Sequence, residues 1–215
     1  MFDGHRELTL GTKRHIARIA LASVLAYGPM VAIHAFCISG GGGWVIAGVE
    51  WFVFVPFLAL LVGLITLPFA LRSRTRQAAI AVLVVVGGLI LCFIPARLAA
   101  YRLRMLGFSL AASRAQPLVQ AIKRHVADHG RPPDGLLALI PRYIDRIPSG
   151  LPELEFVTGE RARKGYGGNE WALYAVVPTG VLNWDQFLYL PDQRYPEVGY
   201  GGWLERVGDW AYVHE

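Results

Sequence analysis

Three long apolar stretches occupy the first half of the chain and predict helices that cross a membrane. They cover residues 16–39, 51–71 and 78–95. About 20 apolar residues span the hydrocarbon core of a bilayer, with a range of about 17 to 25. We therefore predict a cytoplasmic N-terminal segment, 1–15, followed by a region of three transmembrane helices, 16–95.

Apolar residues recur at helical spacing directly after the third stretch. The first apolar stripe contains Leu98, Tyr101, Met105, Phe108 and Ala112, and the second contains Leu118, Ala121, Ile122 and His125. Spacing of three and four residues is typical of one face of an α-helix. Pro117 predicts a kink or a restart of this helix, with Ser113 as the N-cap.

Beyond residue 150 the pattern changes to short stretches rich in aromatic and β-branched residues. These stretches cover residues 154–160, 171–178, 187–191 and 209–215. They predict β-strands, with 163–170 as a hairpin loop. In the last stretch Trp210, Tyr212 and His214 share one face, which we expect to lie in the core. A helix followed by hairpins predicts an α+β domain over 96–215, with a long helix packed on a small antiparallel sheet.

The segment 127–148 joins the helix to the strands and contains three residues that resemble a catalytic or metal-binding group, Asp128, His129 and Asp134. The segment has a structural interpretation as well. Gly130 suits a left-handed helix end, and Asp134 is placed to cap a short helix over 135–140. We therefore predict a connector here rather than a metal or catalytic site.

The sequence QAIKRHVADHGRPPDGLLALIPRYIDRIP, with Asp128, Gly130 and Pro133 in its turn, resembles the globular domain of pilins and type II secretion pseudopilins. The resemblance covers roughly residues 98–148 and implies a pilin-like order of elements, a helix before a small sheet. No pilin processing signature follows Gly87 and Gly88, so the resemblance does not imply assembly into a filament.

The distribution of charge sets the expected orientation in the membrane. Residues 1–108 carry ten Lys or Arg and three acids, whereas residues 109–215 carry eleven and thirteen. The basic residues flanking the first two apolar stretches are Arg6, Lys13, Arg14, Arg18, Arg72, Arg74 and Arg76. By the positive-inside rule they predict a cytoplasmic N-terminus and a periplasmic or extracellular C-terminal domain, in a bacterial-type inner membrane. The residues that oppose this orientation are Arg97, Arg102 and Arg104.

Composition narrows the class of protein further. The chain is 54% hydrophobic and 17% charged, compared with about 25% charged residues in ordinary soluble domains. The basic residues lie in the membrane half, which argues against a nucleic-acid partner. Cys37 and Cys92 both lie in apolar stretches, and the sequence leaves open whether they pair.

Two groups of residues are candidate sites for binding. His34 and Glu50 lie near the outer end of the first two apolar stretches and form a candidate intramembrane polar pair. The candidate partner or ligand surface comprises Trp184, Tyr189, Tyr195, Tyr200 and Trp203. Exposed aromatic patches mark binding surfaces, although aromatic residues are equally typical of strand cores.

We expect a non-enzymatic envelope protein without a cofactor, in contact with membrane lipid and with a protein partner. One alternative is a hydrolase of envelope polymers that uses His129, His214 or loop acids. Another is a small transport or assembly subunit that uses His34 and Glu50. The loop acids Asp192, Glu197, Glu205 and Asp209 also leave calcium binding open.

Overall fold

The computed structural model of the chain describes residues 3–38, 54–178, 185–195 and 202–214. It divides into two compact units. The first contains Met1–Ala32 and Glu50–Arg102, and the second contains Ile33–Val49 and Leu103–Glu215.

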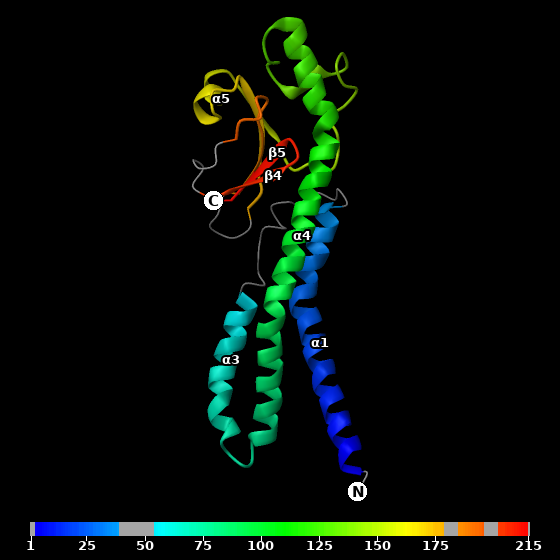
Figure 1. Cartoon of the computed structure of the whole chain (residues 1–215), viewed down its shortest axis with the longest axis vertical. Helices are drawn as coiled ribbons and strands as arrows, with labels where there is room; N and C mark the ends of the chain where they lie inside the picture. The colour runs from blue at the N-terminus through cyan, green and yellow to red at the C-terminus, as the bar shows by residue number, and fades with distance from the viewer. Residues whose placement is uncertain (1–2, 39–53, 179–184, 196–201, 215) are drawn as a thin grey trace. The chain divides into compact units, whose positions relative to one another are not determined.

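The part of the first unit that the structure describes consists of helices (Figure 1). They are α1, Asp3–Ile38; α3, Phe54–Ala70; and the first half of α4, Arg76–His129. Within the described residues, α1 over Lys13–Ala32 and α4 are long and apolar enough to cross a membrane, and α3 is a shorter apolar helix of 17 residues. The first helix begins at Asp3, well before the expected residue 16. Its polar first turns and its apolar stretch form one helix.

Helix α4 continues without a break over 54 residues, so the expected restart at Pro117 is wrong. Ser113 does not act as an N-cap, because its hydroxyl donates to the Ser109 carbonyl one turn earlier, at 3.1 Å. An interior proline costs about 3 kcal/mol. Leu118 and Val119, which are fully buried beside it, show how packing compensates for the lost backbone bond.

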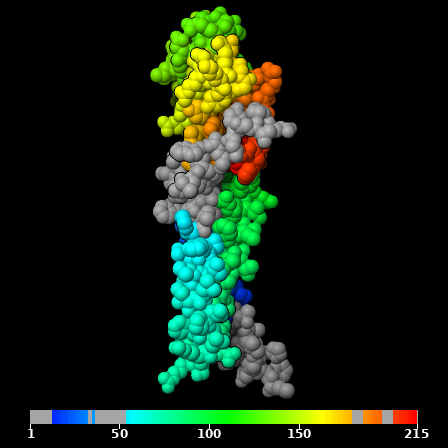
Figure 2. Space-filling view, turned by 90° about the vertical axis from the view of Figure 1, so that its left-hand side faces the viewer, coloured from blue at the N-terminus to red at the C-terminus, as the bar shows by residue number. Residues whose placement is uncertain are grey.

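Small residues allow the helices of the first unit to approach one another. A Cβ atom added to Gly88 of α4 would lie only 2.5 Å from a methyl carbon of Ile19 in α1. On α3, a Cβ added to Gly63 would lie 3.2 Å from Val86. The Tyr27 hydroxyl donates to the Leu89 carbonyl at 2.7 Å, which joins α1 to α4. Figure 2 shows the side chains of α3 and of the first part of α4 lying together along this unit.

The second unit is an α+β domain with one antiparallel sheet. Its strands are β1, Glu155–Thr158; β2, Trp171–Val176; β3, Gln186–Tyr189; β4, Leu204–Val207; and β5, Trp210–Val213. Their order in the sheet is β1-β2-β3-β5-β4. Four of the strands match the predicted stretches, and β4 adds an edge strand that the sequence did not predict.

The sheet is covered on both faces (Figure 1). One face packs on the second half of α4 through a core that includes Phe108, Phe187 and Tyr212. The other packs against α5, Gly159–Gly165, through residues such as Ala162 and Leu188. The expectation that Trp210 and Tyr212 lie in the core is confirmed. The predicted hairpin loop is wrong in part, because residues 163–165 complete α5.

The connector after α4 begins with the predicted turn at Gly130, but the predicted cap at Asp134 is not formed. Gly130 has a φ of +70° and donates its N–H to the Val126 carbonyl at 2.8 Å, which ends the helix. The helix that follows is a short 3₁₀ helix, η2, Leu136–Leu139, and Gly135 occupies its N-cap position without a side-chain bond. Asp134 instead forms an ion pair with Arg131 at 2.9 Å, so the predicted cap is wrong.

Two neighbouring glycines of α4 offer a matched test of helix packing in the first unit. We expect Gly88→Ala to lower the free energy of unfolding in detergent by about 1–3 kcal/mol, because the new methyl group overlaps Ile19. Gly87→Ala is the control, since no atom of another described helix lies within 4 Å of the added Cβ and alanine favours helix. Equal stability of the two variants, measured by denaturant titration, would contradict this packing.

Candidate functional site

Arg104 begins a chain of buried polar groups between α4 and the sheet. It lies on the helix face that carries Phe108 and is only 4% exposed. Its Nε donates to the Tyr212 hydroxyl at 3.2 Å, and its Nη2 donates to the Val177 carbonyl. The guanidinium carbon also lies 5.1 Å from the centre of the Phe108 ring, within cation–π range.

Tyr212 connects this arginine to a buried carboxylate. Its hydroxyl accepts from Arg104 and donates to Asp185 Oδ2. Burial raises the pKa of Tyr212 far above its ordinary value, and the bond to Asp185 adds to this effect, against the lowering influence of Arg104. The hydroxyl therefore stays protonated and remains a donor. A buried cation and a buried anion are thus linked through one neutral group, which offsets part of the cost of their desolvation.

Trp203 and His214 form a stacked pair next to this chain of polar groups. Their ring centres are 4.1 Å apart with planes at 13°, and the His214 N–H donates to the Trp203 carbonyl at 2.9 Å. Trp203 is 65% exposed, whereas His214 is 8% exposed. His214 also contacts the Tyr212 ring, with centres 4.0 Å apart. The indole therefore rests on a fixed surface and keeps its outer side open.

His214 is held in its neutral form. Burial lowers its pKa below the ordinary histidine value, although the nearby Asp185 and Glu205 carboxylates oppose the shift. Its Nε2 lies 3.7 Å from Glu205 Oε2, which is longer than a hydrogen bond. At neutral pH an uncharged imidazole thus supports Trp203.

The predicted aromatic surface is only partly assembled. Tyr189 is fully buried in the core, so its assignment to a surface is wrong. Tyr195 is half-buried, and its hydroxyl accepts from the Leu190 N–H at 2.9 Å and donates to the Asp209 carbonyl at 2.6 Å. Trp203 is exposed as expected. Trp184 and Tyr200 lie outside the described residues.

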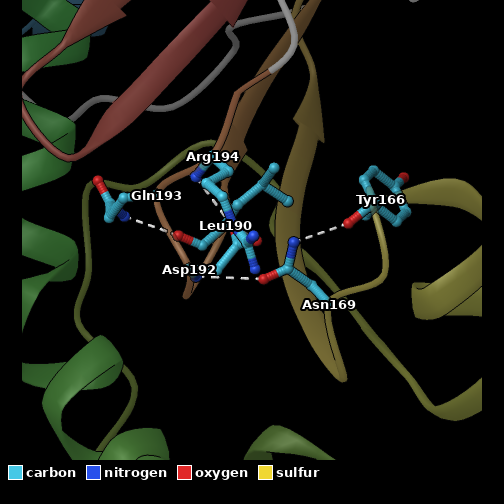
Figure 3. A network of polar contacts seen from close by, with 6 residues as sticks. All are labelled: Tyr166, Asn169, Leu190, Asp192, Gln193 and Arg194. Carbon is cyan, nitrogen blue, oxygen red and sulfur yellow. Dashed lines mark hydrogen bonds and ion pairs between the residues drawn. The ribbon is translucent and has the colours of Figure 1, made fainter.

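The loop acids that the structure describes do not form a metal-ligand group of three. Asp192 accepts from the backbone and side chain of Arg194, both at 3.0 Å, and its N–H donates to the Asn169 side chain (Figure 3). Burial alone would raise the pKa of Asp192, but these hydrogen bonds hold it below its ordinary value. Glu205 lies on β4, and Glu197 is outside the described residues. Where the structure describes the chain, no three His, Cys, Asp or Glu side chains converge as metal ligands.

The connector residues form hydrogen bonds to their neighbours. Asp128 Oδ2 accepts from the Tyr143 hydroxyl at 2.7 Å. His129 stacks on His125 with ring centres 4.3 Å apart and planes at 19°. The His-x-x-x-His spacing of residues 125 and 129 is the signal for this pair, and it is overlooked when His125 is taken only as part of an apolar stripe.

The two histidines of the hydrolase alternative do not meet. Arg104, which contacts Tyr212 beside His214, is separated from His129 by twenty-five residues of α4. That distance is about 38 Å at 1.5 Å per residue. His129 and His214 therefore belong to different regions of the domain.

The candidate intramembrane pair falls outside the described part of the chain, because Glu50 and the side chain of His34 are not described. The side chain of Cys37 is not described either, so its pairing with Cys92 stays a question for the sequence. A different ionisable residue, Arg18 of α1, lines a groove of about 530 Å³ in the first unit. The other lining residues are apolar and come from α3 and α4, with Val55 and Leu89 among them. Arg18 is thus the charged residue of a groove whose other described lining residues are apolar.

Comparison with known proteins gives no relative. No family model, no curated protein and no solved structure matches the chain.

Two buried tyrosines of one core allow the link between Arg104 and Asp185 to be tested. Tyr212→Phe leaves polar atoms of both residues without the shared hydroxyl, so we expect a loss of about 1–3 kcal/mol in the free energy of unfolding. Tyr189→Phe is the control, because its buried hydroxyl has no hydrogen-bond partner among the described residues. Urea unfolding followed by tryptophan fluorescence measures both, and comparable losses would contradict the assigned link.

Proposed function

We propose that the chain is an integral membrane protein with three transmembrane helices, α1, α3 and α4, that carries an α+β domain for binding a protein partner. The apolar surface of α3 supports the membrane assignment. Phe57, Leu58 and Leu64 are all more than half exposed, and water is an unfavourable solvent for such a surface. Its 17 residues also meet the lower limit for a membrane span.

The proposed orientation has a cytoplasmic N-terminus and the α+β domain on the outer side of a bacterial-type inner membrane. Arg72, Arg74 and Arg76 at the turn between α3 and α4 support this orientation through the positive-inside rule. Of the three arginines that oppose it, Arg104 is buried in the domain and hydrogen-bonded to Tyr212. Its charge is therefore accounted for by protein contacts.

Trp203 is the observation that supports a partner-binding role. Tryptophan is enriched among the residues that contribute most to protein interfaces. Here the exposed indole is stacked on a buried histidine and is next to the start of β4. Such support lowers the conformational entropy that binding would otherwise remove. We infer that Trp203 is an anchor for a protein partner in the envelope.

The partner proposal is tested by purification in mild detergent. We expect the wild-type chain to retain a stable protein partner, and we expect Trp203→Ala to reduce its recovery at least tenfold, because a central interface tryptophan contributes about 2 kcal/mol or more. Leu137→Ala is the matched control, since Leu137 is an apolar residue that is 77% exposed on η2. Recovery of the chain alone, or equal losses in both variants, would count against the proposal.

The orientation is tested by fusing a reporter that is active only outside the cytoplasm. We expect activity for a fusion after residue 215 and none for a fusion at Arg74, in the turn between α3 and α4. Inverted activities at the two positions would show the opposite orientation. Activity at both would show that α4 does not cross the membrane.

A further inference from the structure

His125 and His129 occupy adjacent turns at the end of α4, on one face of the helix. Their rings are stacked, with centres 4.3 Å apart and planes at 19°. His129 is exposed and His125 is half-buried, so both rings lie at the domain surface. The pair is separate from the buried polar groups around Arg104 and from the stacked pair of Trp203 and His214.

The hydrogen bonds of the two rings fix which nitrogen carries the proton. His125 Nδ1 lies 3.2 Å from the Arg131 carbonyl oxygen, and His129 Nδ1 lies 3.1 Å from the His125 carbonyl oxygen. A carbonyl oxygen only accepts, so each Nδ1 is assigned as the donor from this pattern. In the neutral rings, both Nε2 atoms therefore keep a free lone pair.

A second layer of contacts orients the His129 ring. The Tyr143 hydroxyl donates to Asp128 Oδ2 at 2.7 Å, and its oxygen lies 3.4 Å from His129 Nδ1. The Tyr143 oxygen thus lies beside an Nδ1 whose N–H donates to the His125 carbonyl. Histidines that bind metals commonly donate their other N–H to a carboxylate or a backbone carbonyl, which fixes the ring and strengthens the ligand. Both histidines here have such a partner.

We propose that the Nε2 atoms of His125 and His129 bind one divalent transition-metal ion, of the class of Zn²⁺, Ni²⁺ or Cu²⁺. Two histidines four residues apart on one helix face are a known arrangement for zinc. Two nitrogens bound tetrahedrally to one Zn²⁺ at 2.0–2.1 Å lie about 3.3 Å apart. Because the stacked rings lie nearly parallel, both side chains must rotate to bring their Nε2 atoms to this separation. Imidazole favours these metals over Mg²⁺ and Ca²⁺.

With two protein ligands the ion keeps open coordination positions, which water molecules fill. We leave Asp134 and Asp128 out of the proposed ligand set, since Asp134 is paired with Arg131 and Asp128 accepts from the Tyr143 hydroxyl. The site therefore differs from the group Asp128, His129 and Asp134 that the sequence first indicates. It is a two-histidine site in which Tyr143 is a positioning residue.

The test uses the full-length chain in detergent, purified with a tag that lacks histidine and stripped of metal. Titration with Zn²⁺ and with Ni²⁺, followed by calorimetry, is expected to show one ion per chain for at least one of the two metals. His125→Asn and His129→Asn should each abolish this binding. His15→Asn is the matched control, since His15 lies in α1 and has no second histidine four residues away.

Tyr143→Phe separates a built site from two incidentally close imidazoles. It keeps both ligands and removes the hydroxyl, so we expect metal affinity to fall about 10- to 100-fold. Circular dichroism confirms that each variant is folded. The proposal is overturned if the wild-type chain binds neither metal more tightly than the double variant His125→Asn/His129→Asn, or if His15→Asn causes the same loss. Unchanged affinity in Tyr143→Phe would overturn the role of Tyr143.

Discussion

The second unit depends on the packing of one helix face against a sheet. From Phe108 to Ile122, α4 places fully buried residues against β2, β3 and β5, and stacked aromatic rings fill the contact. Phe108 and Phe187 lie with their ring centres 4.8 Å apart. This burial supplies the stabilisation that allows the helix to continue through Pro117, where local preference alone predicts a break. The same helix begins in the first unit, so α4 contributes to the core of both.

Arg104 shows why a charge is tolerated in this contact. An unpaired guanidinium would be very costly to bury, and here the Tyr212 hydroxyl and the Val177 carbonyl accept hydrogen bonds from two of its three nitrogens. Because Asp185 accepts from the same hydroxyl, the observed alignment of helix and sheet brings all three groups into contact. An apolar contact tolerates sliding better than this arrangement does. We infer that the hydrogen bonds joining Arg104, Tyr212 and Asp185 favour this register of α4 on the sheet.

The sequence predicts the elements whose local preference and tertiary packing agree. Residues 210 and 212 alternate correctly for a core strand, and Gly130 ends its helix as expected. Strand β4 was missed because two of its four residues, Glu205 and Arg206, are charged, which an edge strand tolerates. Tyr189 was misplaced because aromatic residues are typical of both cores and surfaces. Its burial depends on α4, which no short window of sequence contains. The contact between Arg104 and Tyr212 joins residues 108 positions apart and leaves no local signal.

The histidines of the domain illustrate how environment decides the chemistry of one residue type. His214 is buried against Trp203 and Tyr212, and its lowered pKa leaves an uncharged ring that serves as a packing surface. His125 and His129 lie at the surface, and carbonyl groups hold their Nδ1 protons. A lone pair on an accessible nitrogen is available to a ligand, whereas one in a packed core is not. Accessibility and the partner of the second nitrogen, rather than the presence of histidine, therefore separate a structural role from a binding role in this fold.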